Sequence, residues 1–167
     1  YVGLTLAVVM AERGFRVYGV EINKNIVKIL NRGKSHFFET DINLRLKRVL
    51  SKKLFSAHHR IPKAKNKFNN YIITVGTPLN KFNRPRVDMI ERATKEIAQS
   101  MEEDSHIILR STVKIGTTRN IVMPILKKSH KKFSLSFCPE RTLEGDALSE
   151  LEKLPQIISG INNVSMQ

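Results

Sequence analysis

The chain has 167 residues, of which 41% are hydrophobic, and a formal net charge of +14. A chain of this length can bury a proper core, and its apolar stretches fall far short of the roughly 20 residues that a bilayer-spanning helix requires. Its one cysteine, Cys138, excludes an internal disulfide and fits a reducing compartment, so we expect a cytoplasmic protein that does not enter a membrane.

The excess positive charge is concentrated in residues 42–87. This segment contains twelve Lys and Arg residues and no acidic residue, whereas the rest of the chain is nearly balanced. A basic patch of this kind can bind nucleic acid or another polyanion. Few aromatic residues are interleaved with the basic ones, so a base-stacking surface is weakly supported. A nucleic-acid or polyanion-binding module therefore stands as the alternative function, and we favour a function without nucleic acid.

The hydrophobic pattern predicts helices that alternate with short apolar strands. We expect helices over about residues 4–11, 25–31, 42–50, from Asp88 as the cap to about 101, and 117–126, with a helix-like segment over 142–151. We expect strands over residues 15–20, 71–75, 107–109, 133–137 and 156–158. This alternation predicts an α/β fold with a mostly parallel sheet covered on both faces.

Each predicted strand ends in polar, turn-forming residues. These groups are Glu21, Gly76-Thr77-Pro78, Ser111-Thr112 and Pro139-Glu140. Because the carboxyl ends of parallel strands share one edge of the sheet, such residues line a cleft of the kind that holds nucleotides.

The start of the chain is similar to the second half of a dinucleotide-binding fingerprint. Val2 and Gly3 open a helix, and Glu21 ends the next strand eighteen positions after Gly3. A glycine lets a pyrophosphate approach the helix N-terminus, and the acid can accept hydrogen bonds from ribose hydroxyls. The acid would also repel a 2′-phosphate, which favours NAD over NADP. The alternative is a glycine that serves only a turn.

The segment from Cys138 to Asp146 carries two carboxylates and a guanidinium directly after a strand. Glu140 and Glu144 are four positions apart, so a helix over 142–151 would bring them together at its N-terminal end. One carboxylate can then orient a water or a substrate hydroxyl while the other stays charged. The alternative is helix capping, since acids are favoured in a first helical turn.

Other polar residues near the strand ends have two interpretations each. Thr77 and Thr112 can donate hydrogen bonds to a cofactor or a water, or serve local turns. Arg110 can meet a phosphate or lie on a helix surface. His58 and His59 lack a second cluster with ligand spacing, so we expect no metal site.

Four motifs in collinear order resemble the UDP-glucose/GDP-mannose dehydrogenase family. They are Tyr1-Val2-Gly3-Leu4-Thr5-Leu6-Ala7, Val75-Gly76-Thr77-Pro78-Leu79, Arg110-Ser111-Thr112-Val113 with Gly116-Thr117-Thr118-Arg119, and Pro139-Glu140-Arg141-Thr142-Leu143-Glu144-Gly145. The Pro-Glu-Arg-Thr version, followed by Leu154-Pro155-Gln156-Ile157-Ile158, looks more like the UDP-N-acetylmannosamine or UDP-N-acetylglucosamine branch than the UDP-glucose branch.

The resemblance implies NAD-dependent oxidation of the C6 hydroxyl of a UDP-sugar, with a UDP-N-acetylhexosamine favoured, to the uronic acid for polysaccharide precursor synthesis. In this family the reaction passes through an aldehyde and an enzyme-bound thioester, and the full-length enzymes are homo-oligomers. By similarity, Val2, Gly3 and Glu21 would hold the adenosine half of NAD. Thr77 and Thr112 would line the cofactor, and Thr112 would also position a water. The acid/base and substrate-contacting carboxylates would be Glu140 and Glu144.

The sequence also departs from the family. The family's catalytic cysteine, with its partner lysine and asparagine, lies downstream of the matching region, so we expect Cys138 to be a small buried residue rather than the nucleophile. The family's first strand and first two fingerprint glycines are not present before Tyr1. We therefore expect residues 1–167 to form a partial NAD-binding domain, Rossmann-like and doubly wound but lacking its first strand. The central helix and the UDP-binding domain would be absent, and the chain alone would be inactive.

A third interpretation is a related NAD-dependent β-hydroxyacid dehydrogenase. The loop from Pro139 to Thr142 argues against it, because those enzymes do not need a pair of carboxylates at that strand end.

Overall fold

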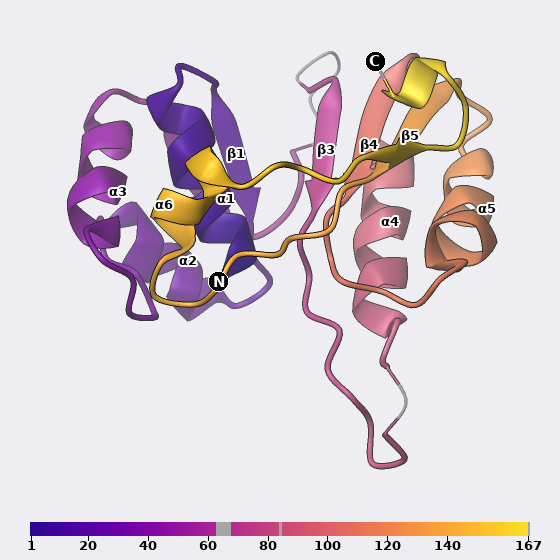
Figure 1. Ribbon diagram of the computed structural model, residues 1–167. Helices are drawn as coiled ribbons and strands as arrows, with labels where there is room; N and C mark the ends of the chain where they lie inside the picture. The colour runs from indigo at the N-terminus through magenta and orange to yellow at the C-terminus, as the bar shows by residue number, and fades with distance from the viewer. Residues whose placement is uncertain (63–67, 84, 167) are drawn as a thin grey trace. The chain divides into compact units, whose positions relative to one another are not determined.

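The computed structural model describes residues 1–62, 68–83 and 85–166, and the chain divides into two compact units. Unit 1 comprises Tyr1–Ile61 and Arg141–Pro155, and unit 2 comprises Pro62–Glu140 and Gln156–Gln167. In Figure 1, the indigo and violet helices of unit 1 are joined by an orange helix from much later in the sequence. Each unit is therefore built from two separate stretches of the chain.

Unit 1 consists of helices around a parallel pair of strands. Its elements are α1 (Val2–Glu12), β1 (Val17–Val20), α2 (Lys24–Asn31), α3 (Ile42–Ser51), β2 (Phe55–His58) and α6 (Ala147–Lys153). Strands β1 and β2 run parallel, with Val17 opposite Phe55. A parallel pair requires a long connection, which α2 and α3 supply.

The sequence explains where the helices of unit 1 begin and end. Asn23 caps α2, because its Oδ1 accepts hydrogen bonds from the backbone N–H groups of Asn25, at 3.0 Å, and Ile26, at 3.4 Å. The helix stops before Gly33, whose φ of 73° lies in the left-handed region that favours glycine. A side chain there would also meet Lys47, since an added Cβ would lie 2.5 Å from Lys47 Cγ.

The core of unit 1 lies where α1, α3 and α6 meet the strands. Its members are apolar residues spaced by three or four along each helix: Leu4, Ala7, Val8, Ala11, Leu30, Ile42, Leu46, Val49, Phe55, Ala57 and Leu148. This spacing places one apolar stripe of each helix on the inside. Burying each large aliphatic side chain contributes about 1.5–3 kcal/mol to the stability of the unit.

Unit 2 contains a four-stranded sheet in the order β3-β4-β5-β6. Its strands are β3 (Asn70–Ile73), β4 (Ser105–Leu109), β5 (Phe133–Phe137) and β6 (Ser159–Gly160). Its helical segments are α4 (Asp88–Ser100), the π-helical turn η1 (Thr118–Val122), α5 (Met123–Lys127) and the 3₁₀ turn η2 (Val164–Met166). Strands β3, β4 and β5 run parallel and β6 runs antiparallel to β5. Helices α4 and α5 pack side by side (Figure 1).

The core of unit 2 follows from alternation in the strands and an apolar stripe on α4. Ile107 and Leu109 of β4 and Leu135 of β5 are fully buried, as expected for central strands of a covered sheet. On α4, Ile90 and Ile97 are buried. Thr94 is buried between them, and its hydroxyl donates to the carbonyl of Ile90 at 2.7 Å. That hydrogen bond removes the cost of burying a free hydroxyl.

The structure confirms the α/β class and the mostly parallel pairing: the pairs β1–β2, β3–β4 and β4–β5 are parallel, and the pair β5–β6 is antiparallel. Within the described ranges these strands form two sheets, of two and four strands. The predicted helices and strands up to Phe137 are present with small shifts in their ends, but strand β2 was not predicted. Within the same ranges, every helix is too short or too polar to cross a bilayer.

Three local predictions were wrong. Asp88 does not cap α4; it is the first helical residue, and its carboxylate instead accepts hydrogen bonds from Arg86 Nε at 2.9 Å and Nη2 at 2.8 Å. The helix predicted over 142–151 begins at Ala147 instead, because Gly145, with a φ of 102°, interrupts it. The strand predicted over 156–158 is β6, at Ser159–Gly160.

Candidate cofactor site

The N-terminal end of helix α1 presents backbone N–H groups. Tyr1 occupies the capping position, and its carbonyl accepts hydrogen bonds from the N–H groups of Leu4 and Thr5, both at 3.2 Å. The N–H groups of Val2 and Gly3 precede these and lie outside the intrahelical ladder. Such groups, together with the helix dipole, attract an anion such as a phosphate.

Two carboxylates lie within electrostatic reach of this helix end. Glu21 directly follows β1; its N–H donates to the carbonyl of His58 at 2.9 Å, and its Oε1 accepts from the N–H of Asn23 at 2.7 Å. Burial lowers the pKa of the Tyr1 amino group, while the charges of Glu144 and then Glu21 act in the opposite direction. Val2, Gly3, Glu21 and Glu144 all belong to unit 1, and their roles stay predictions.

In unit 2, the loops after β3 and β4 are joined by hydrogen bonds. The hydroxyl of Thr77 donates to the carbonyl of Thr112 at 2.9 Å, and the hydroxyl of Ser111 donates to the carbonyl of Val75 at 2.7 Å. The hydroxyl of Thr77 thus bonds the neighbouring loop rather than its own turn, and its lone pairs remain able to accept. The side chain of Thr112 is exposed.

Glu140 is held in a buried ion pair after β5. Its Oε2 accepts hydrogen bonds from Arg110 Nη2 at 2.6 Å and Nε at 3.2 Å, and the two side chains are 6% and 7% exposed. The remaining arm of the guanidinium, Nη1, lies 2.9 Å from the sulfur of Cys138. Arg110 is thus buried against Glu140 and Cys138 rather than on a helix surface. Cys138 is a small buried residue, as predicted.

The two carboxylates of the Pro-Glu-Arg-Thr loop do not share a helix end. Glu140 belongs to unit 2, and Glu144 lies in a turn of unit 1 that precedes α6. The prediction that a helix places them side by side is wrong in its geometry, because α6 starts only at Ala147. The roles given to the two residues stay predictions.

One buried residue next to Tyr1, Glu39, escaped the sequence analysis. Glu39 is 4% exposed, and it accepts hydrogen bonds from the Tyr1 hydroxyl and from backbone N–H groups of the Glu144 loop. Glu39 lies in a polar loop between α2 and α3, where a glutamate is ordinarily solvated. No local sequence signal distinguishes it, because its partners are distant in the chain.

The contact between Tyr1 and Glu39 makes stability depend on pH. Burial, followed by the hydrogen bond to Glu39, raises the pKa of Tyr1 to about 12. Because this exceeds its value of 10.0 in the unfolded chain, the contribution is complete below pH 10 and is lost as pH rises toward about 12.

We expect the unfolding free energy of the wild type to fall relative to that of Tyr1→Phe between pH 10 and about 12. Urea denaturation of both proteins at each pH measures this difference. Tyr18 and Tyr71 titrate in both proteins, so their effects cancel. Parallel pH profiles for the two proteins would contradict the assignment.

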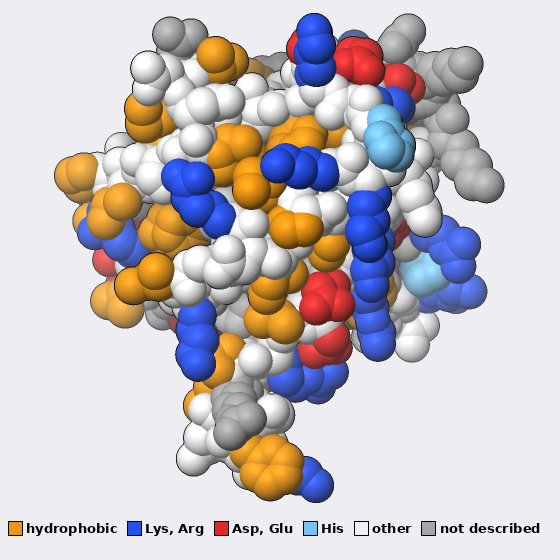
Figure 2. All heavy atoms as spheres, turned by 90° about the vertical axis from the view of Figure 1, so that its right-hand side faces the viewer, with side chains coloured by type: hydrophobic (Ala, Val, Ile, Leu, Met, Phe, Trp, Pro, Cys, Tyr) orange, Lys and Arg blue, Asp and Glu red, His pale blue; other side chains and the backbone are white. Residues whose placement is uncertain are grey.

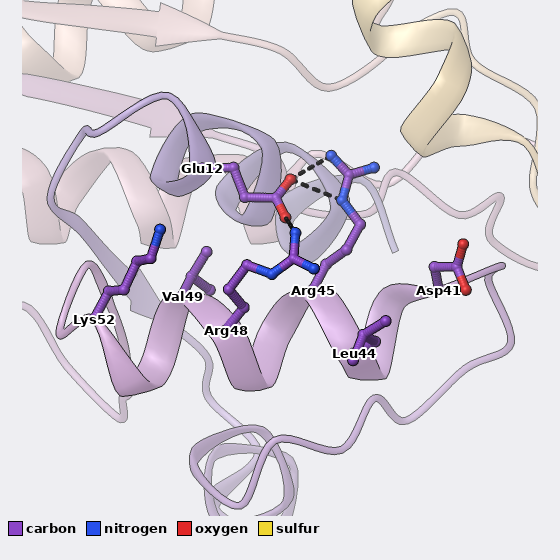
Figure 3. Close-up of a pocket in the computed structure, with 7 residues that line it drawn as sticks. All are labelled: Glu12, Asp41, Leu44, Arg45, Arg48, Val49 and Lys52. Carbon is purple, nitrogen blue, oxygen red and sulfur yellow. Dashed lines mark hydrogen bonds and ion pairs between the residues drawn. The ribbon is translucent and has the colours of Figure 1, made fainter.

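A separate pocket of about 460 Å³ lies on the outer face of α3 (Figure 3). One of the two acids that line it, Glu12, accepts hydrogen bonds from Arg45 Nε at 2.7 Å and from Arg45 Nη2, and lies 3.8 Å from Arg48 Nη1. The other lining residues are Asp41, Leu44, Val49 and Lys52. The predicted site residues do not line this pocket, and its charges largely neutralise one another. We do not assign the cofactor to it.

The basic segment of residues 42–87 is partly neutralised within unit 1, because Arg45 and Arg48 both face Glu12. Lys63, Lys65, Lys67 and Arg84 of that segment lie outside the described residues. Figure 2 shows one face of the molecule, on which basic side chains are spread among hydrophobic and uncharged ones. The polyanion-binding alternative stays a prediction.

His58 is engaged in local contacts. Its ring stacks on Tyr18 with the centroids 3.7 Å apart, and its Nε2 lies 2.9 Å from the hydroxyl of Ser56. Across the part of the chain that the structure describes, no group of three or more His, Cys, Asp or Glu side chains is arranged to hold a metal ion.

Parallel strands with polar residues at their carboxyl ends, and a helix with a glycine in its first turn, define a Rossmann-like α/β fold. The chain belongs to the UDP-glucose/GDP-mannose dehydrogenase family, whose NAD binding domain matches residues 1–167. A solved GDP-mannose dehydrogenase from Pseudomonas aeruginosa, in a ternary complex, superposes with a TM-score of 0.93 and 28% identity, over 99% of this chain and 40% of that one. The predicted fold class and family are thereby confirmed.

Several proteins similar to this chain are named UDP-N-acetyl-D-mannosamine dehydrogenase. The UDP-N-acetyl-D-mannosamine dehydrogenase of Campylobacter jejuni is 34% identical over 173 residues, and that of Pyrococcus horikoshii is 31% identical over 166 residues. These matches cover 96% and 97% of this chain but 42% and 39% of the relatives. A solved Pyrococcus horikoshii enzyme of this type has a TM-score of 0.92, over 99% of this chain and 40% of that one. The chain thus spans about two fifths of the length of these relatives.

Proposed function

We propose that this chain forms the cofactor-binding part of an NAD-dependent nucleotide-sugar 6-dehydrogenase, which oxidises the C6 hydroxyl of a UDP-N-acetylhexosamine to the uronic acid. The observation that carries the proposal is the position of Glu21. In a chain of this family, a carboxylate directly follows β1, the strand that comes after the helix with Val2 and Gly3 in its first turn. That arrangement suits a dinucleotide, which offers ribose hydroxyls and a pyrophosphate together.

The residues of unit 1 fit NAD. The N–H groups of Val2 and Gly3 would donate to the pyrophosphate, and Gly3 leaves space for it to approach the backbone. Glu21 would accept hydrogen bonds from the ribose hydroxyls, and its negative charge would repel the 2′-phosphate of NADP. When bound, NAD supplies the hydride acceptor for oxidation of the sugar alcohol.

The strand-end residues of unit 2 would serve the nicotinamide side and the substrate. Thr77 and Thr112 are fixed to each other, at 2.9 Å from hydroxyl to carbonyl, so both can line the cofactor without moving independently. Thr112 has an exposed side chain that can hold a water. Arg110 fixes the direction of the Glu140 carboxylate. Glu144 is exposed and would contact the substrate.

The substrate class rests on the relatives, which are named for UDP-N-acetylmannosamine. A uronic acid made from such a nucleotide sugar suits the synthesis of acidic polysaccharides. We also propose that the complete protein assembles as a homo-oligomer. Its thiol nucleophile would lie outside residues 1–167, since Cys138 is buried against Arg110.

Replacement of Glu21 by alanine tests the cofactor assignment. We expect Glu21→Ala to weaken NAD binding at least about tenfold, because a hydrogen bond to a charged group contributes about 1.5–3 kcal/mol. The preference for NAD over NADP should shrink at the same time. Calorimetric titration of both nucleotides measures the two effects.

Glu91→Ala is the matched control, because Glu91 lies on α4 of unit 2 and makes a long ion pair with Lys95, at 3.8 Å. It should leave NAD affinity unchanged. Equal affinities for NAD in wild type and Glu21→Ala would refute the assignment of Glu21.

A further inference from the structure

We propose that Glu39 is a positioning residue, which fixes the loop that carries Glu144 at the N-terminal end of α1. The inference rests on the function proposed above, because it gives Glu144 a fixed place in the site. Glu39 itself touches neither the cofactor nor the substrate in this proposal. All of the residues involved belong to unit 1.

A single buried carboxylate connects two distant segments of the chain. Glu39 Oε2 accepts hydrogen bonds from the Tyr1 hydroxyl and from the N–H of Gly145 at 3.0 Å. Glu39 Oε1 accepts from the N–H of Leu148 at 3.2 Å. A carboxylate that is 4% exposed would be costly without such donors. These contacts explain why an acid is tolerated in the interior of the unit.

Glu39 also serves as the cap of α6. Asp146 occupies the capping position, but within the described residues its side chain makes no capping hydrogen bond. The N–H of Leu148, in the first turn of the helix, donates to Glu39 instead. Negative charge is favoured at a helix N-terminus, and hydrogen bonds to a charged acceptor are the stronger kind. The start of α6, in the segment Arg141–Pro155, is therefore fixed by Glu39, which lies in the segment Tyr1–Ile61 of the same unit.

The backbone is held on both sides of Glu144. The N–H of Leu143 donates to Glu150 Oε2 at 2.7 Å, and the carbonyl of Leu143 lies 3.2 Å from the Tyr1 hydroxyl. After Glu144, the N–H of Gly145 is shared between Glu39 and the Tyr1 hydroxyl, at 3.0 and 2.8 Å. The side chain of Glu144 itself is exposed. A carboxylate that is exposed to solvent on a fixed backbone is the arrangement that a substrate-contacting acid needs.

Hydrogen exchange of the full chain tests the first part of the proposal. In Glu39→Gln, the new amide can accept with only one of its two terminal atoms, so a donor of the 143–148 loop loses its partner. We expect amide exchange in this loop to become about tenfold faster, and exchange in α3 and β4 to stay unchanged. Asp146→Asn is the matched control in the same loop and should change nothing.

A double-mutant cycle on NAD affinity tests the second part. In the wild-type background, Glu144→Gln removes a negative charge from the region of the pyrophosphate and should tighten NAD binding by about threefold. In the Glu39→Gln background this effect should disappear, because Glu144 is no longer held there. A residue with a merely structural role would lower stability without abolishing this coupling.

The outcomes separate the two proposals. Unchanged exchange in the loop, equal acceleration throughout unit 1, or an equal Glu144→Gln effect in both backgrounds would overturn the role of Glu39. Failure of the wild type to bind NAD would overturn the proposed function. The hydrogen-exchange result would then still decide whether Glu39 fixes the loop that carries Glu144. Tyr1→Phe is the milder second variant, with a smaller acceleration expected, because Glu39 still accepts from both loop amides.

Discussion

Replacing Arg110 with methionine is expected to lower the free energy of unfolding by about 3–5 kcal/mol, because it removes the guanidinium that donates two hydrogen bonds to the buried Glu140 carboxylate. The two side chains are 7% and 6% exposed, so water cannot replace the guanidinium. The Sγ of Cys138 would lose its neighbouring donor as well. Urea denaturation followed by circular dichroism measures the loss.

The exposed pair of Arg86 and Asp88 is the matched control. Its side chains are 46% and 36% exposed, and exposed pairs contribute about 0–1 kcal/mol. Arg86→Met should therefore cost little. The double variant Arg110→Met/Glu140→Leu should recover most of the loss, because it replaces both charges of the buried pair with apolar side chains. If Arg110→Met and Arg86→Met cost the same, the buried pair does not have the strength assigned to it.

Leu46→Ala is expected to destabilise unit 1 by about 2–5 kcal/mol. Leu46 is fully buried in the core between α1 and α3, and its truncation loses apolar burial and leaves a cavity. The loss should appear as a lower denaturation midpoint in urea.

Leu44→Ala supplies an internal standard, because it makes the same chemical change two residues away on the same helix. Leu44 is 59% exposed, so its truncation should alter stability by less than about 0.5 kcal/mol. Similar losses for the two variants would show that α3 does not pack as described.

Elements with strong local periodicity could be predicted from the sequence, and elements that depend on distant partners could not. Helix α1 and strand β5 carry clear apolar patterns over their whole length. Strand β2 is four residues long and contains Ser56 and His58, so its pattern is weak, and it forms because it pairs with β1. Strand β6 has two residues and is defined only by its pairing with β5.

The same distinction applies to the candidate site. The sequence predicts Glu21, Thr77 and Glu140 as site residues because a residue that follows a parallel strand lies at the ligand-binding edge of a sheet, whatever its neighbours. The ion pair of Glu140 with Arg110 and the contacts of Glu39 join residues 30 and more positions apart. A single sequence contains no signal for such pairs, since each partner alone is an ordinary polar residue.

The discontinuity of unit 1 has a consequence for how the chain matures on the ribosome. Glu39 and Leu148 are separated by 109 positions, so the carboxylate is synthesised long before the amide that it binds. Until α6 emerges, the nascent chain must keep Glu39 hydrated and the core of α1 and α3 open at one side. Unit 1 can therefore complete its folding only after β3, β4 and β5 have been made. Slow closure of this long loop, rather than local helix formation, should limit the rate at which unit 1 reaches its native state.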